Sequence, residues 1–230
     1  MKVVAFNAGS AGRTTSQLAQ EALEGAASQG ADTEMVMLAE QDIRFCRNCL
    51  TCYQDLDSTI APCPQDDDMP GLLEKIRQAD GLIFASPVHA GFVNGLMTTF
   101  LERCIWTLCR PTGEIMGLKG APLPRLQDKP RAVASIMSAG LVPEQMRQYC
   151  DAGTPWVLET AVMIANGTAV GDLYAAASFA QPVPDDQWKR ALLLRRLSQD
   201  QLQKAHDLGA GLAQALAQGK VAPFDPAALG

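Results

Sequence analysis

Lys2-Val3-Val4-Ala5-Phe6-Asn7-Ala8-Gly9-Ser10 opens the chain with a short apolar run that passes into a glycine turn. The run predicts a buried strand, because it is apolar without a helical period and ends at turn residues. Apolar residues then recur at helical spacing over 16–29, and Gly30 follows, as glycine commonly does at a helix end. This stretch therefore predicts a strand, a tight turn and a helix in succession.

The same alternation continues along the chain. We expect further strands over 33–38, 81–85, 131–137 and 168–173, and a loop over 110–130. Helices are expected after Asp66, over 93–108, over 143–165 with a break near 153–155, and over most of 185–218. Strands separated by helices form a parallel sheet covered on both faces. The pattern predicts a flavodoxin-like α/β three-layer sandwich whose five-stranded parallel sheet has the order 2-1-3-4-5.

We expect one domain over residues 1–230, because no internal repeat or low-complexity linker divides the chain. It would carry a cysteine-rich loop at 39–66 and a C-terminal helical extension at about 185–218. A long irregular segment such as 39–66 would be costly to leave unpacked. We therefore expect it to meet a partner subunit in a homodimer or homotetramer.

The composition excludes several classes of protein. The 230 residues include 19 Lys and Arg and 25 Asp and Glu, for a net charge of −6, which argues against a nucleic-acid partner. No stretch approaches the roughly 18 apolar residues of a membrane span, and the N-terminus does not have the pattern of a signal peptide. We expect a cytoplasmic protein without a membrane partner, in which seven cysteines favour metal or redox chemistry over structural disulfides.

Three loops are expected to meet at the carboxyl ends of the strands, where ligands bind in such sheets: 9–16, 86–94 and 138–140. The first combines glycines, hydroxyl groups and a helix N-terminus, which together favour an anion. It matches neither a Walker A loop nor a G-x-G-x-x-G fingerprint. The alternative is an ordinary polar turn with Ser16 as the N-cap.

Four motifs carry a resemblance to a known family. They are Gly9-Ser10, Asp67-Asp68-Met69, the stretch from Ala79 to Val88, and Phe100-Leu101-Glu102-Arg103. Their order and spacing resemble those of the NADPH-dependent FMN reductase group of the flavodoxin-like superfamily, over the part of the chain up to Gly140. The resemblance implies non-covalently bound FMN.

The same resemblance implies which residues hold the flavin. The phosphate would lie on Ser10, Gly12, Arg13, Thr14, Thr15 and Ser16. The ring would lie along Pro87, Val88, His89, Ala90, Gly91 and Asn94, with Ser138, Ala139 and Gly140 as the third flavin-facing loop. His89 stands where the family commonly has an aromatic residue. No catalytic side chain is required, because the flavin carries the redox chemistry.

Cys46, Cys49 and Cys52 recur at every third residue, and Cys63 follows before a proline. Bacterial ferredoxins bind iron–sulfur clusters with a similar run. Placed just before Asp67-Asp68-Met69, the pattern resembles that of the iron–sulfur flavoproteins, which implies a 4Fe–4S cluster on these four cysteines. Two alternatives remain: a zinc ion, although structural zinc sites usually pair two separated knuckles, and metal-free thiols at a subunit interface. Cys104 is expected in the core, and Cys109 and Cys150 are expected to be inert.

The resemblance implies an oxidoreductase that passes electrons between NAD(P)H or a ferredoxin and an acceptor such as a quinone or flavin. Its partner would be a small-molecule or protein redox partner. The alternative hypothesis is a non-enzymatic flavodoxin-like redox sensor or scaffold, in which the cysteines act as switch thiols.

Overall fold

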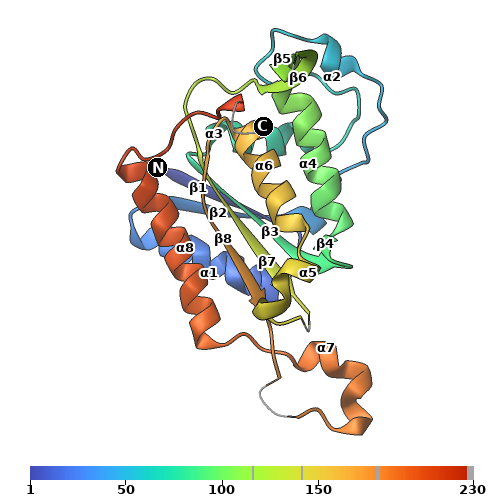
Figure 1. Cartoon of the computed structure of the whole chain (residues 1–230), viewed down its shortest axis with the longest axis vertical. Coiled ribbons are helices and arrows are strands. Elements are labelled where there is room, and N and C mark those ends of the chain that lie inside the picture. The colour runs from blue at the N-terminus through green and yellow to red at the C-terminus, as the bar shows by residue number, and fades with distance from the viewer. Residues whose placement is uncertain (116, 141, 180–181, 227–230) are drawn as a thin grey trace.

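A twisted parallel sheet forms the centre of the molecule in the computed structural model, which describes residues 1–115, 117–140, 142–179 and 182–226 (Figure 1). Its parallel strands are β1 (Lys2–Asn7), β2 (Asp32–Met37), β3 (Gly81–His89), β7 (Ala132–Ala139) and β8 (Thr168–Ala176), in the order β2-β1-β3-β7-β8. Counted among themselves, these five strands have the predicted order 2-1-3-4-5. The short strand β4 (Phe92–Val93) adds an antiparallel pairing to β3. The predicted fold class is confirmed.

Helices cover both faces of the sheet. One face carries α1 (Thr14–Ser28) and α8 (Gln199–Ala217), and the other carries α3 (Met69–Gln78), α4 (Gly95–Leu108) and α6 (Gly153–Ala165) (Figure 1). Helices α1 and α8 approach so closely that a Cβ on Gly209 would lie 1.7 Å from the carbonyl oxygen of Ala22. A Cβ on Gly25 would likewise lie 1.9 Å from the oxygen of His206. Glycine at these two positions therefore sets the distance between the helices.

The cysteine-rich segment connects β2 to α3. It contains the 3-10 turn η1 (Leu38–Glu40) and one short helix, α2 (Thr51–Gln54). Two left-handed residues, Asn48 and Leu50, bend the chain between these elements. The segment packs at the end of α4, beside the β5–β6 hairpin (Figure 1).

The hairpin of β5 (Cys109–Ile115) and β6 (Leu118–Pro124) corrects one prediction. The sequence predicted a loop over 110–130, because prolines and glycines are depleted in strands. Prolines are nevertheless tolerated on edge strands, and both strands of a two-stranded sheet are edges.

The C-terminal extension is less continuous than predicted. The 3-10 turn η3 (Asp185–Arg190) and the short helix α7 (Ala191–Leu194) form an arm that projects from the body (Figure 1). The chain then returns through a bridge between Ser178 and Arg196 before α8 begins. The predicted break near 153–155 is confirmed. The stretch 143–165 is divided into η2 (Glu144–Met146), α5 (Arg147–Cys150) and α6, which begins at Gly153.

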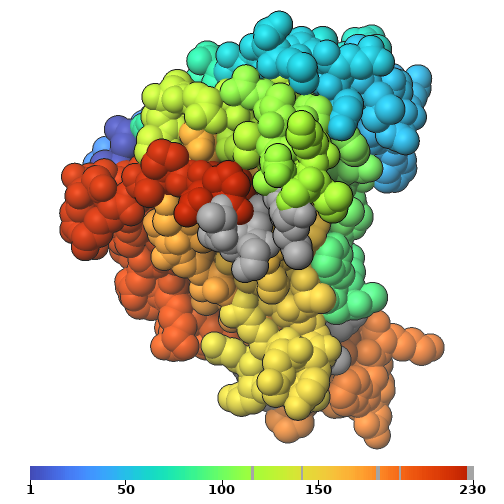
Figure 2. Space-filling view, turned by 45° about the horizontal axis from the view of Figure 1, so that its top comes forward, coloured from blue at the N-terminus to red at the C-terminus, as the bar shows by residue number. Residues whose placement is uncertain are grey.

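Figure 2 shows the cysteine-rich segment, in cyan, at one end of the molecule and the arm, in orange, at the other. Within the described residues, no helix combines the length and the apolar character that crossing a bilayer requires.

Candidate functional site

The three predicted loops lie together at the carboxyl edge of the sheet, and hydrogen bonds join them. The hydroxyls of Thr15 and Ser138 lie 2.5 Å apart and connect the first loop to the third. The side-chain amide of Asn94 donates to the oxygen of Ala8 at 2.8 Å and connects the second loop to the first. Thr15, Ser138 and Asn94 therefore hold the loops in place, a role that the sequence did not indicate.

The first loop leaves the N-terminus of α1 open. Residues 10–13 are exposed, and Arg13 occupies the N-cap position without a side-chain hydrogen bond to the helix. The alternative that Ser16 is the N-cap is wrong, because Ser16 lies inside α1. The first amides of a helix carry partial positive charge and attract anions. The loop therefore offers backbone donors, the hydroxyls of Thr14 and Ser16, and the Arg13 guanidinium.

The second loop is a β-hairpin. Val88 pairs with Val93 and His89 pairs with Phe92, so that Ala90 and Gly91 form a two-residue turn. Both turn residues have positive φ, at +52° and +81°, as a type I′ turn requires. The hairpin ends at Asn94, which accepts from the amide of Met97 at 3.0 Å and caps α4. His89 is exposed at the edge of this hairpin.

Arg195 reaches the third loop from the far end of the chain. Its guanidinium donates to the carbonyl of Ala139 at 3.3 Å and lies beside Gly140. No local signal connects a residue after a helical arm with a loop more than fifty residues earlier.

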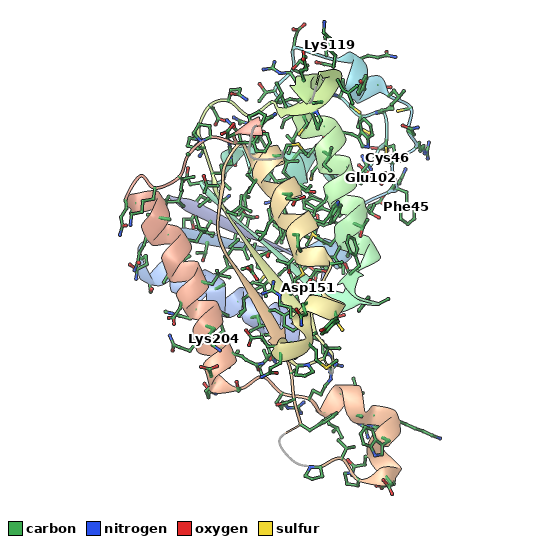
Figure 3. All side chains as sticks on the ribbon, viewed as in Figure 1. Phe45, Cys46, Glu102, Lys119, Asp151 and Lys204 are labelled. Carbon is green, nitrogen blue, oxygen red and sulfur yellow. The ribbon has the colours of Figure 1, made fainter. Side chains whose placement is uncertain are left out.

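All four predicted cysteine ligands line one cavity. Cys46, Cys49, Cys52 and Cys63 line a small cavity of about 20 Å³, together with Gln65, Arg103, Trp106 and Thr107. Figure 3 shows Cys46 beside α4, near Glu102. Among the described residues, no three Cys, His, Asp or Glu side chains are placed to hold a single metal ion. The four sulfur atoms thus line the same cavity without converging on one point.

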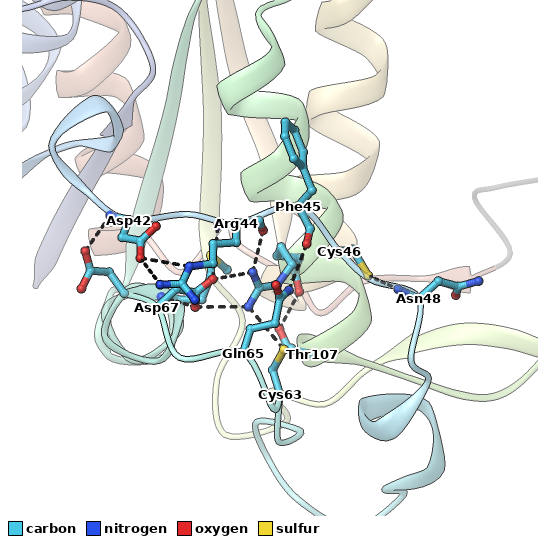
Figure 4. Close-up of polar contacts among 12 residues, drawn as sticks. Asp42, Arg44, Phe45, Cys46, Asn48, Cys63, Gln65, Asp67 and Thr107 are labelled. Carbon is cyan, nitrogen blue, oxygen red and sulfur yellow. Dashed lines mark hydrogen bonds and ion pairs between the residues drawn. The ribbon is translucent and has the colours of Figure 1, made fainter.

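A buried arginine forms part of the cavity wall. Arg103 is 2% exposed, and its Nη2 donates to the sulfur of Cys63 at 3.3 Å. Its Nη1 donates to Asp67 at 2.6 Å and to the carbonyl of Arg44 at 2.7 Å. Figure 4 shows Arg44, Cys63 and Asp67, the three residues that this guanidinium contacts, gathered in one region. One guanidinium therefore contacts the chain on both sides of the cysteine run. The sequence identified Arg103 only as part of a family motif.

The Arg103–Asp67 pair stays charged despite its burial. Burial, the largest single effect, raises the pKa of Asp67. The hydrogen bond and charge of Arg103, together with the backbone amides of Arg44 and Met69, outweigh it, and the net pKa is lowered. Burial, again the largest single effect, lowers the pKa of Arg103, but the contacts with Asp67 and Cys63 together leave it raised. The pair is the buried, hydrogen-bonded kind in which each charge compensates the other.

A second buried arginine, Arg125, anchors the cysteine-rich segment from the β6 side. Its guanidinium donates to the carbonyls of Cys52 at 3.1 Å, Ser58 at 3.0 Å and Cys109 at 3.0 Å, and also to Asp55. These contacts are to backbone oxygens, whereas Arg103 contacts the sulfur of Cys63.

The cysteines of the chain fall into different environments. Burial raises the pKa of Cys52, and a hydrogen bond with Thr51 lowers that of Cys49. Burial raises the pKa of Cys109 to about 12 and that of Cys104 well above its ordinary range. Cys104 belongs to the core, as predicted, and Cys109 is buried as a protonated thiol.

The model of the NADPH-dependent FMN reductase family matches residues 1–169 of the chain. The chain belongs to this family. The match covers all three loops and the cysteine-rich segment, and it extends well beyond the part on which the motif resemblance was based.

Curated relatives of this FMN reductase family member are iron–sulfur flavoproteins. One from Methanocaldococcus jannaschii is 34% identical over 89 residues, which are 39% of this chain and 44% of the relative. Another, from Archaeoglobus fulgidus, is 30% identical over 139 residues, which are 56% of this chain and 58% of the relative. The chain thus spans about half the length of the curated relatives it matches.

Solved structures share the fold of this family member. A flavone reductase gives a TM-score of 0.64 at 19% identity and covers 96% of this chain and 64% of its own. The NAD(P)H:quinone oxidoreductase from Methanothermobacter marburgensis gives 0.60 at 17% identity, covering 91% and 98%. At these identities the likeness supports the flavodoxin-like fold alone.

Proposed function

We propose that this protein is an FMN-dependent oxidoreductase that passes electrons through a 4Fe–4S cluster. The observation that carries the proposal is the cavity lined by Cys46, Cys49, Cys52 and Cys63, in a chain of the FMN reductase family. The names of the curated relatives support it.

The three loops fit an FMN. The open N-terminus of α1 offers amides and hydroxyls to a phosphate, with Arg13 as the adjacent cation. The hairpin presents a rigid edge, fixed by its turn and by Asn94, to a flat ring. The proposed FMN-binding residues are Ser10, Gly12, Arg13, Thr14, Thr15, Ser16, Pro87, Val88, His89, Ala90, Gly91, Asn94, Ser138, Ala139 and Gly140.

The four thiols that line the cavity suit an iron–sulfur cluster by their chemistry. Thiolates are the ligands of such clusters, and four of them surround one space here: Cys46, Cys49, Cys52 and Cys63. A zinc ion would need four sulfurs about 2.3 Å from one point, whereas these sulfurs line a cavity. The buried Oε1 of Gln65 also lines the wall and has no hydrogen-bond partner among the described residues.

The chain's residues would position and insulate the two groups. FMN would exchange two electrons with a nicotinamide donor, and the cluster would exchange one at a time with its partners. NADH or NADPH, or a ferredoxin, is the proposed donor, and a quinone or free flavin is a proposed acceptor. A cytoplasmic location and a homodimer or homotetramer also stay predictions.

Anaerobic purification with iron, sulfide and flavin measured per chain tests the proposal. We expect one FMN and about four each of iron and acid-labile sulfide. The Cys63→Ser variant is expected to lose iron and keep FMN, because a ligand is removed far from the flavin loops. Cys150→Ser is the matched control, since Cys150 lies on α5, and it should retain both.

A preparation that binds FMN but takes up no iron on anaerobic reconstitution would contradict the cluster. A colourless protein that cannot be reconstituted with FMN would favour the redox sensor instead. NADPH oxidation with added quinone then separates an enzyme from an electron carrier.

A further inference from the structure

We propose that Arg103 is a positioning residue that holds Cys63 by a hydrogen bond to its sulfur and raises the reduction potential of the cluster. The inference rests on the proposed function. In this inference Arg103, which lies on α4 and outside the cysteine-rich segment, sets the position of Cys63.

Several contacts fix the orientation of the Arg103 guanidinium. The side chain is 2% exposed and Asp67 is fully buried, so their 2.6 Å contact is shielded from water. The carbonyl of Arg44 fixes the same Nη1, and Asp67 also contacts Nη2 at 3.3 Å. Because the guanidinium is planar and rigid, these contacts fix the direction of the remaining Nη2–H toward Cys63.

The position of the anchors explains how Arg103 holds the ligand. Arg44 precedes the first cysteine by two residues, and Cys63 and Asp67 follow the last cysteine of the run. Arg103 contacts all three from the middle of α4, an element that packs in the core. The buried side chain of Arg103 therefore connects the two ends of the cysteine-rich segment.

A hydrogen bond to a ligand sulfur changes the electronics of a cluster. The reduced cluster carries one more negative charge than the oxidised one, and a donor directed at the sulfur stabilises that charge. A donor in a buried site acts more strongly, because water does not screen it. Arg103 therefore favours the reduced state.

The test is an anaerobic redox titration of the holoprotein, with the cluster followed by its electron paramagnetic resonance signal. Arg103→Lys keeps a cation for Asp67 but lacks the planar fork, so it cannot satisfy Asp67 and Cys63 together. We expect its cluster potential to shift to lower values while the FMN potential stays at the wild-type value. Arg125→Lys is the matched control: it loosens the same segment but removes no donor to sulfur, so its cluster potential should not shift.

The outcomes separate this inference from the function on which it rests. Full iron content with an unchanged cluster potential in Arg103→Lys would overturn the inference alone. Equal shifts in the Arg103 and Arg125 variants would also overturn it, because a general loosening would then explain both. Loss of iron from Arg103→Lys, with FMN kept and with iron retained by Arg125→Lys, would support it. A wild-type protein without iron would overturn both proposals together.

Discussion

Gly9 leaves room for Thr15, which connects the first and third loops. A Cβ at this position would lie 2.6 Å from Cβ of Thr15, whose hydroxyl bonds Ser138. We predict that Gly9→Ala displaces Thr15, lowers the free energy of unfolding by about 1–3 kcal/mol and weakens FMN binding. Urea unfolding and FMN titration measure the two effects. Gly71→Ala is the control, because its Cβ would meet open space, and it should unfold no more readily than wild type. Wild-type stability and FMN affinity in Gly9→Ala would refute the prediction.

Glu34 connects stability to pH. The hydrogen bond from Lys2 at 2.8 Å, followed by that from Lys75, holds the pKa of Glu34 below its ordinary value of 4.5. A carboxylate with a lowered pKa in the folded state stabilises the protein fully above the unfolded value. That stability is lost as pH falls below about 4.5 and through the folded pKa. We predict that Glu34→Gln removes part of the acid dependence of urea unfolding. Parallel curves for the two proteins from neutral pH to pH 3 would exclude this role.

The hairpin of β3 and β4, which we propose contacts FMN, contains one unfavourable residue in its turn. Ala90 adopts φ +52°, which costs a non-glycine residue about 1 kcal/mol, whereas Gly91 at +81° adopts its φ freely. We predict that Ala90→Asn stabilises the protein and preserves FMN affinity, since Asn-Gly suits a type I′ turn. Gly91→Ala should destabilise it by about 1–2 kcal/mol and weaken FMN binding. Thermal unfolding with and without FMN is the measurement, and equal melting temperatures for both variants would contradict the predicted turn.

The spacing of apolar residues predicted the helices and strands that build the core. The five parallel strands and their covering helices follow from runs of apolar residues that the core requires. The β5–β6 hairpin could not be predicted this way, because its strands contain prolines and depend on packing against the cysteine-rich segment. The start of α8 could have been found, since Ser198 and Gln201 form a capping box. The candidate sites could be predicted to the same extent. The loops and cysteines are local features of the sequence, whereas Arg103 and Arg195 contact residues far away in the chain, which no local pattern indicates.

The whole molecule exposes apolar side chains at its cysteine-rich end. Phe45 is 75% exposed and Leu118, on the hairpin, is 74% exposed. We predict that this end mediates self-association, so that Phe45→Ser and Leu118→Ser each weaken it at least about tenfold. Sedimentation at several concentrations is the measurement. Tyr149→Ser is the control, because Tyr149 is equally exposed, at 76%, but lies on α5. A monomeric wild-type protein would refute the prediction.

Helix α4 gives the molecule a fixed spacer. It is capped by Asn94, at the end of the β3–β4 hairpin, and carries Arg103 at the wall of the cysteine-lined cavity. A rise of about 1.5 Å per residue separates these two residues by about 14 Å along the axis. Inserting one residue between them would turn Arg103 by about 100° and direct its guanidinium away from Cys63. For the proposed FMN and cluster, α4 would therefore fix the separation between Asn94 at one site and Arg103 at the other.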